Sequence, residues 1–180
     1  MDKTALEPLR FPIGRFKIQE NISEETINQC IRDIETLPKL MRMAVDQLNE
    51  TQLDMSYRPN GWTIRQVVHH VADSHINSYI RFKWALTEDA PTIKAYDEKK
   101  WAEQEEAKTA PVKVSLKILE SIHERWVMIL KNLNKEDLKR TFIQPESGFA
   151  YTLEMAITLY AWHGKHHVAH IESLKERSNW

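Results

Sequence analysis

The 180-residue sequence has one cysteine, four glycines and almost no net charge. A single cysteine, Cys30, cannot form an internal disulfide, which fits a reducing, cytoplasmic compartment. Four glycines and seven prolines are too few for the many turns of a β-sandwich or β-barrel, so we expect a mostly helical chain. The net charge of −1 gives no indication of a nucleic-acid or membrane-surface partner.

Long apolar runs are also missing. The longest strictly apolar run is the five residues from Trp126 to Leu130, whereas a membrane span requires about 20. The N-terminal MDKTALEPLR lacks the basic start and apolar stretch of a secretory signal. With 42% hydrophobic and 28% charged residues, the chain has an ordinary globular composition. We therefore expect one domain over residues 1–180.

Four segments repeat apolar residues at the spacing of amphipathic helices. Four helices of this kind predict an all-α fold, most economically a four-helix bundle. The segments cover residues 23–48, 64–86, 119–133 and 152–174.

The starts of the first two helices carry recognisable caps. Ser23, followed by two glutamates, is a typical N-cap, and Thr63 with Gln66 forms a capping box. Pro38 lies within the first pattern and is expected to kink that helix or divide it in two.

Three segments lie outside the helical pattern. Residues 1–20 show no helical period and are expected to form an extended arm over the body. Residues 140–152 predict a short β-hairpin that turns at 145–148. The connection over residues 88–114 is long for a compact domain, which is typical of a lid or binding loop, although a solvated excursion with a short helical turn fits equally well.

Seven of the eight histidines fall in two short windows, and the second window contains two pairs four residues apart. Residues at this spacing lie on one face of a helix, where two imidazoles can bind one ion. His167 lies on the apolar stripe and His163 flanks it, so this pair is expected to face the bundle interior. His166 is expected to be exposed. Gly164 would let a neighbouring helix or a ligand approach closely.

The first window contains a polar stripe on the second helix. His70, Asp73, Asn77 and Arg81 follow one another at helical spacing, next to an apolar face. Polar side chains buried in a bundle require partners or an ion to offset their desolvation.

Together, the two windows predict a metal site formed by His70, His163 and His167. Three neutral nitrogen ligands suit Zn²⁺, and also Ni²⁺, and they leave at least one position open. Asp73 or Asn77 would orient an imidazole from outside the ligand set. The competing interpretation is that these are ordinary core histidines with satisfied hydrogen bonds, which is what we expect for His75 and His123.

Several stretches together resemble the DinB/YfiT-like family. They are FPIGRFK, YRPNGWTIRQVVHHVADSHINSYIRFKWALTE, AYDEKKW and TLYAWHGKHHVAHI, and they span most of the chain. The resemblance implies an up-down-down-up four-helix bundle, commonly a homodimer, that binds zinc or nickel. By motif, the family's ligands correspond to His70, His163 and His167.

The resemblance implies two activities. Members of the family have been described as metal-dependent hydrolases, and it also includes transferases and isomerases that depend on a low-molecular-weight thiol. For this sequence the implied thiol is bacillithiol. A hydrolase normally benefits from a carboxylate base near the metal, and Asp73 is the only acidic residue on the His70 stripe. The sequence therefore favours thiol transfer to a small electrophile, with hydrolysis as the alternative and a non-catalytic metal sensor as a third hypothesis.

Three further residues are candidate contacts of the small-molecule substrate or thiol. Arg81 and Arg65 are candidates to bind its carboxylates. Tyr160, one turn from His163, is a candidate hydrogen-bond donor.

Overall fold

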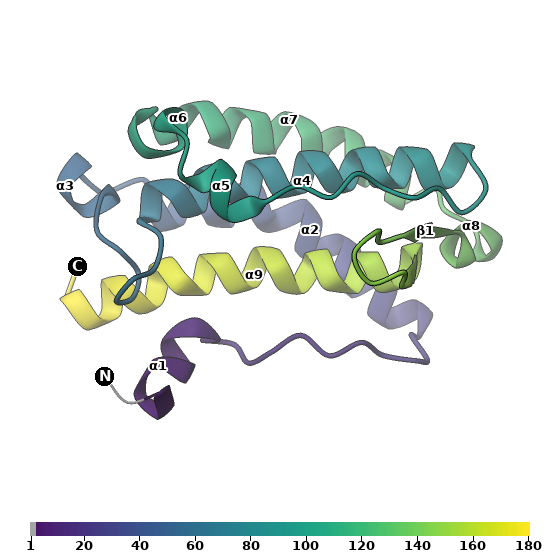
Figure 1. Ribbon diagram of the computed structural model, residues 1–180, viewed down its shortest axis with the longest axis horizontal. Helices are drawn as coiled ribbons and strands as arrows, with labels where there is room; N and C mark the ends of the chain where they lie inside the picture. Colours follow the sequence, from purple (N-terminus) through teal and green to yellow (C-terminus); the bar gives the residue numbers. More distant parts are fainter. Residues whose placement is uncertain (1–2) are drawn as a thin grey trace.

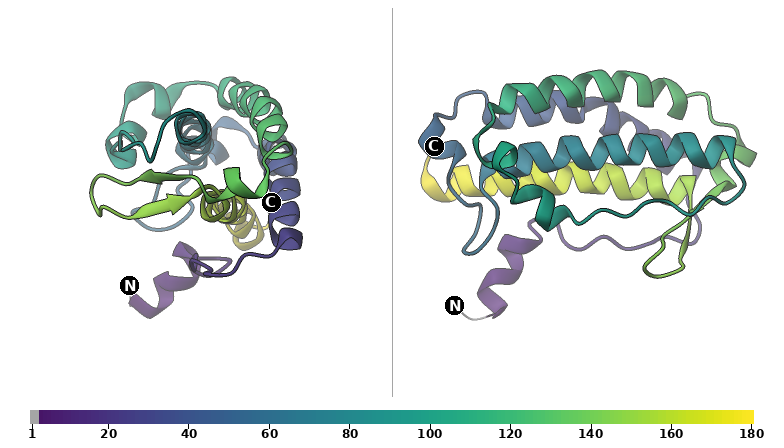
Figure 2. Two further views of the ribbon diagram at one scale, coloured as in Figure 1. Left: turned by 90° about the vertical axis from the view of Figure 1, so that its right-hand side faces the viewer. Right: turned by 45° about the horizontal axis from the view of Figure 1, so that its top comes forward.

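Four long helices lie side by side along the longest axis of the molecule, in a computed structural model that describes residues 3–180 (Figure 1, Figure 2). They are α2 (Glu24–Val45), α4 (Ile64–Thr87), α7 (Val112–Leu130) and α9 (Leu153–Ser178). Helices α2 and α4 each pack against both α7 and α9. The predicted four-helix bundle is therefore confirmed.

The directions of the helices explain the long connection in the middle of the chain. Helices α4 and α7 run in one direction, whereas α2 and α9 run in the other (Figure 1). The chain must therefore travel back along the bundle after α4 before α7 begins. This return contains two short helices, α5 (Glu98–Ala102) and α6 (Glu105–Thr109), and both pack on α4.

The predicted helix starts are confirmed. The Ser23 hydroxyl accepts a hydrogen bond from the Thr26 amide at 3.1 Å. Thr63 and Gln66 form the expected capping box, with reciprocal bonds of 3.1 and 2.9 Å. The Thr152 hydroxyl caps α9 by accepting a hydrogen bond from the Met155 amide at 3.2 Å. These caps satisfy amide groups that have no partner inside the helix.

Pro38 does not divide the first long helix in two, which corrects one of the two outcomes expected for it. Helix α2 continues through Pro38 to Val45. Ile34, Leu37 and Met41 lie on either side of the proline and are buried in the core. Packing along this face outweighs the one backbone hydrogen bond that proline removes.

The N-terminal arm is only partly extended, which corrects the expectation for residues 1–20. Residues Lys3–Arg10 form the short helix α1, which packs on α9, and residues 11–22 then run along the bundle to α2 (Figure 1). Tertiary contacts stabilise this helix despite Pro8 within it. Met1 and Asp2 lie outside the described residues.

The predicted hairpin precedes α9. Strand β1 (Thr141–Ile143) pairs antiparallel with β2 (Ala150–Thr152). Gly148 adopts a φ of +68° in the turn, a conformation that favours glycine. The first residues of the long connection pair with the other edge of β1, where the Ile93 amide donates to the Ile143 carbonyl at 3.0 Å. The hairpin therefore anchors one end of that connection. Two further short helices, α3 (Glu50–Leu53) and α8 (Lys135–Lys139), complete the chain.

The interior contains two apolar clusters separated by a layer of histidines. One cluster surrounds Phe82 and Trp126, and the other surrounds Met41 and Ile64. The histidines come from α4, α7 and α9, and all but His70 lie between the residues of the two clusters in sequence. They are His70, His75, His123, His163 and His167.

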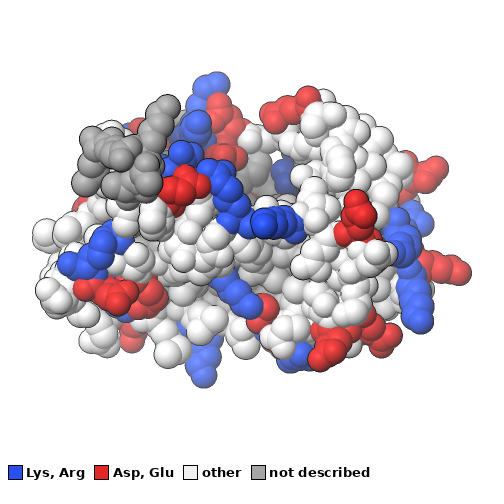
Figure 3. Space-filling model, turned by 90° about the horizontal axis from the view of Figure 1, so that it is seen from below, with Lys and Arg blue, Asp and Glu red and all other residues white. Residues whose placement is uncertain are grey.

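The outer surface carries charges of both signs. On the face covered by the N-terminal arm, lysine and arginine side chains are interspersed with aspartate and glutamate (Figure 3). Within residues 3–180, no helix is both long enough and apolar enough to cross a membrane.

Helix α9 approaches α2 closely at Gly164, and a substitution there tests this contact. A Cβ added there would lie 2.8 Å from Cδ1 of Leu37 and closer still to Cδ2. We expect Gly164→Ala to lower the free energy of unfolding by about 1 kcal/mol, since overpacking costs about 1–3 kcal/mol and the gain in helix propensity returns about 1 kcal/mol. In a Leu37→Ala background, the same change should be stabilising. Urea unfolding of all four proteins would measure this, and equal effects in both backgrounds would contradict the close contact.

Candidate metal centre

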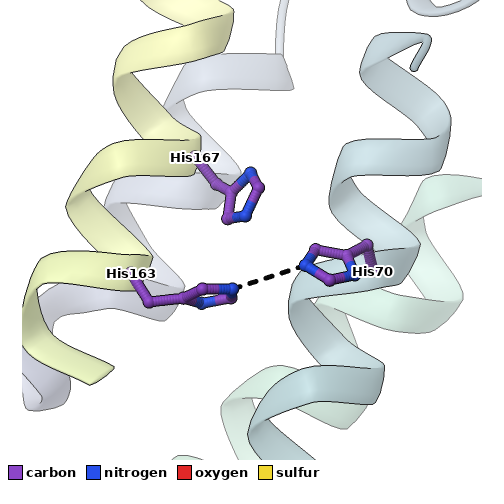
Figure 4. Close-up of side chains that lie close together, drawn as sticks. All are labelled: His70, His163 and His167. Carbon is purple, nitrogen blue, oxygen red and sulfur yellow. Dashed lines mark hydrogen bonds between the residues drawn. The ribbon is translucent and has the colours of Figure 1, made fainter. Parts of the chain in front are cut away.

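Three imidazoles from two helices meet in the middle of the bundle (Figure 4). His70 comes from α4, and His163 and His167 lie one turn apart on α9. One ring nitrogen of each lies within 4.8 Å of those of the other two. The Nε2 atoms of His70 and His163 are 3.3 Å apart. The structure thus brings together the three histidines that the sequence selected.

The surroundings keep these imidazoles uncharged. Burial lowers the pKa of His70 to about 4. Burial also lowers the pKa values of His163 and His167 well below the usual range, and repulsion from neighbouring histidines lowers them further. A neutral imidazole has one nitrogen with a free lone pair, which is the form that binds a metal ion. At neutral pH the cluster therefore offers three donors that need not lose a proton first.

The donor set fits one first-row divalent ion. In tetrahedral zinc sites with Zn–N distances of about 2.0–2.1 Å, two ligand nitrogens lie about 3.3–3.4 Å apart. The separation between His70 and His163 matches this value. Within residues 3–180, the group contains no cysteine or carboxylate in addition to the three histidines. Three protein ligands leave a position for a further ligand, as in catalytic zinc sites.

Two more histidines extend the site into the core. Nε2 of His75 lies 3.2 Å from Nδ1 of His163, and Nδ1 of His75 lies 2.9 Å from Nε2 of His123. Nδ1 of His123 lies 2.7 Å from the Ile34 carbonyl oxygen. Both residues are buried and hydrogen-bonded, as expected, but the sequence did not indicate that they contact a candidate metal ligand.

His166 is buried, which corrects the expectation that it would be exposed. Its ring stacks between those of Phe11 and Trp162, with ring centroids 5.9 and 4.4 Å away. The N-terminal arm covers this face of α9. The prediction was wrong because the periodicity of α9 shows which face His166 lies on but not that the arm packs against that face. Next to it, Nδ1 of His170 lies 3.4 Å from Nδ1 of His167, and Nε2 lies 3.1 Å from the Arg10 carbonyl oxygen.

Asp73 and Asn77 do not take the orienting role expected for them. The Asn77 amide donates to the Asp73 carbonyl at 2.9 Å, and among the described residues neither side chain bonds to the three imidazoles. Burial, followed by repulsion from Glu106, raises the pKa of Asp73 to about 6. In this structure histidines occupy the positions where a carboxylate or amide was expected.

A cleft of about 750 Å³ gives access to the three imidazoles. The connection between α4 and α7 forms one wall through Tyr96 and Lys99, and the hairpin contributes Gln144. Trp62 and Trp162 line it beside the histidines. This part of the connection therefore forms one wall of the cleft, while most of the residues in the connection remain exposed to solvent.

Arg81 and Tyr160 both line this cleft, as their candidate roles require. The Arg81 guanidinium donates to the Tyr160 hydroxyl at 3.2 Å, and its buried Nε has no hydrogen-bond partner among the described residues. Within residues 3–180, no carboxylate forms a salt bridge with Arg81. The cleft thus contains an arginine that is not paired with any carboxylate of the described residues, although Asp97, Glu98 and Glu146 also line the cleft.

Arg65, the other candidate arginine, has a structural role instead. Its buried side chain donates to Asp54 at 2.7 Å, to Glu50 at 2.5 Å and to the Ala110 carbonyl at 3.1 Å. These contacts tie the start of α4 to α3 and to the end of the connection, and they occupy the donors that a ligand would need. Arg65 does not line the cleft.

The sequence alone did not single out Tyr96, Lys99 or Gln144. They lie in the connection and the hairpin turn, where no periodic pattern indicates which side chains face inward. Tyr96 and Lys99 do fall within AYDEKKW, one of the stretches that carried the family resemblance. In the sequence, this motif was the feature that could have indicated a functional role for Tyr96 and Lys99.

Comparisons with protein families and known proteins find relatives over most of the chain. Residues 33–171 match the model of the DinB superfamily. A relative from Bacillus cereus is 56% identical over 175 residues, which cover 97% of this chain and 100% of the relative. A relative from Bacillus thuringiensis has the same identity and coverage. Both carry the name "putative metal-dependent hydrolase".

A solved structure shares the whole architecture. YfiT from Bacillus subtilis is described as a probable metal-dependent hydrolase with an unusual four-helix bundle topology. It is 47% identical to this chain, with a TM-score of 0.94, and the match covers 96% of this chain and 99% of YfiT.

The histidines make the stability of the metal-free protein depend on pH. Burial lowers the pKa of all eight, so the unfolded chain, with pKa values near 6.5, binds more protons than the folded one. The free energy of unfolding should therefore fall as the pH decreases from about 6.5 toward 4, by up to about 1.4 kcal/mol per pH unit for each group. Urea unfolding of chelator-treated protein at pH 7.5 and 5.5 measures this.

Asp73→Asn provides the control for this prediction. The raised pKa of Asp73 has the opposite sign, because the folded state binds its proton more tightly than the unfolded state does. Removing this carboxyl should steepen the loss of stability between pH 6 and 4. Equal free energies of unfolding at pH 7.5 and 5.5 would show that the imidazoles are not buried in neutral form.

Proposed function

Since this chain belongs to the DinB superfamily, we propose that it is a metal-dependent enzyme in which His70, His163 and His167 hold one divalent ion, Zn²⁺ or Ni²⁺. The names of the Bacillus relatives support metal dependence, and three neutral donors within 4.8 Å of one another, two of them 3.3 Å apart, support the ligand assignment. When bound, such an ion lowers the pKa of a coordinated thiol or water and so supplies the nucleophile.

The proposed reaction is transfer of a low-molecular-weight thiol of the bacillithiol type to a small electrophile. This choice rests on Arg81, which lines the cleft and has a buried Nε without a hydrogen-bond partner among the described residues. In addition, the group of candidate metal ligands in the described residues contains no carboxylate. Arg81, held by Tyr160, would bind a carboxylate of the thiol. Trp62 and Trp162 would exclude water from the reacting groups. A thiol held as thiolate needs no protein base.

Hydrolysis is the second candidate, favoured by the names of the relatives. It calls for a group that accepts a proton from the attacking water. Asp73 does not line the cleft. Asp97, Glu98 and Glu146 do line it, but none of them belongs to the group of candidate ligands. At Asp97, which caps α5, a hydrogen bond from the Lys100 amide lowers the pKa and weakens the carboxylate as a base. The chain's own residues therefore serve thiol transfer better than hydrolysis.

A paired assay decides between the two reactions. We expect bacillithiol to react with a monochlorobimane-type electrophile in the presence of the metal-loaded protein, and a panel of esters and amides to remain intact without thiol. His167→Ala should stay folded but lose the ion, with an affinity loss of more than about 100-fold, and lose turnover with it.

His69→Gln is the matched control for this variant. His69 neighbours His70 but bonds to Ser115 and to the Ala110 carbonyl, away from the three imidazoles. This variant should keep both ion and activity. Turnover of the ester or amide panel without thiol, and no acceleration of the thiol reaction, would reverse the assignment in favour of hydrolysis.

Arg81 should determine the affinity for the anionic thiol. Arg81→Gln removes a charge-assisted hydrogen bond worth about 1.5–3 kcal/mol, which corresponds to an increase of about 10- to 150-fold in KM for the thiol with kcat little changed. Arg125→Gln removes an exposed arginine that contacts Tyr79 outside the cleft and should leave KM unchanged. Steady-state kinetics with varied thiol tests the pair, and equal KM values for both variants would remove Arg81 from the binding site.

A further inference from the structure

Two chains of hydrogen-bonded histidines lead from the candidate ligands to backbone carbonyl groups. The first runs from His163 through His75 and His123 to the Ile34 carbonyl of α2, with separations of 3.2, 2.9 and 2.7 Å. It crosses the core from α9 through α4 and α7 to α2. The members of this chain are buried, apart from partly buried His163.

The carbonyl group of Ile34 at the end of the first chain fixes which atom donates and which accepts in each of its hydrogen bonds. A carbonyl oxygen only accepts hydrogen bonds, so Nδ1 of His123 must carry the proton. A neutral imidazole has one proton, so Nε2 of His123 accepts and Nδ1 of His75 donates to it. By the same reasoning, Nε2 of His75 accepts and Nδ1 of His163 donates. Nε2 of His163 is then left with its lone pair, and this is the atom that faces Nε2 of His70.

The second chain reaches the same result from the N-terminal arm. The Arg10 carbonyl accepts from Nε2 of His170 at 3.1 Å, so Nδ1 of His170 is an acceptor. Nδ1 of His167, 3.4 Å away, must then donate to it. This leaves the lone pair of His167 on Nε2, the nitrogen that points toward His70 and His163 in Figure 4.

We infer that the carbonyl groups of Ile34 and Arg10 set the tautomers of His163 and His167, with His75, His123 and His170 as positioning residues that transmit this choice. The inference rests on the proposed metal site and adds to it the groups that hold the site ready. In the opposite tautomer, His163 or His167 would place a proton where an ion has to bind. The arm is therefore part of the metal site, although it contributes no ligand.

The tautomers are measurable without any metal. In the full-length, chelator-treated protein labelled with ¹⁵N-histidine, we expect the ring proton of His75, His123, His163 and His167 on Nδ1, and that of His170 on Nε2. Long-range ¹H–¹⁵N spectra distinguish the two nitrogens. A proton on Nε2 of His163 or His167 would overturn the inference.

A pair of variants tests whether the tautomer controls metal affinity. His123→Phe keeps an aromatic ring but removes both bonds, so zinc affinity, measured by competition with a chelator, should fall about 10- to 100-fold. His123→Gln keeps a donor for Ile34 and an acceptor for His75, so its affinity should stay within a few-fold of wild type. His69→Gln, a buried histidine on α4 outside both chains, should bind zinc as wild type does.

The two proposals fail in different ways. Wild-type affinity in a folded His123→Phe protein would overturn the positioning role and leave the metal site intact. Absence of zinc binding by wild-type protein would overturn the proposed function, whereas the ¹⁵N spectra of the metal-free protein would still test the tautomers. For the second chain, His170→Phe keeps a ring to stack on Tyr57 and should also weaken zinc binding about 10- to 100-fold.

Discussion

The centre of the bundle contains neutral imidazoles where most helical bundles place aliphatic side chains. Each buried imidazole has a donor and an acceptor that lose their bonds to water on folding, and both must be satisfied inside the protein. Along the series from His163 to Ile34, other imidazoles and a backbone carbonyl group provide these partners. Nδ1 of buried His166 has no partner among the described residues. Apolar clusters on either side of this layer exclude water and hold the pKa values down. Most of the chemistry of the site follows from this arrangement.

The helix directions connect this layer to the outside. Because α4 and α7 are parallel, a long return segment must pass along the bundle, and that segment forms one wall of the cleft over the histidines. The hairpin anchors the start of this segment through Ile143. The return segment that the helix directions require therefore also forms a wall of the cleft. As a result, residues from outside the four long helices, such as Tyr96 and Lys99, line the cleft.

The cleft combines neutral imidazole donors with the cationic side chain of Arg81. Arg81 is held by Tyr160 but has no carboxylate partner among the described residues, an arrangement that suits an anionic ligand entering from solvent. The N-terminal arm closes the opposite side of α9 through Phe11 and the Arg10 carbonyl. Residues far from one another in sequence thus surround the three imidazoles on several sides.

The sequence by itself determined the bundle, the helix caps at Ser23 and Thr63, the hairpin and the choice of His70, His163 and His167. These features depend on local periodicity and on residues a few positions apart, which a single sequence records directly. Only the tertiary structure decided that residues 3–10 form a helix, that His166 is buried and that Arg65 pairs with Asp54 and Glu50. It also decided that His75, and not Asp73, hydrogen-bonds to His163, and that His123 hydrogen-bonds to His75. Each of these outcomes depends on contacts between distant segments, and helical spacing says which face a residue lies on but not what packs against that face.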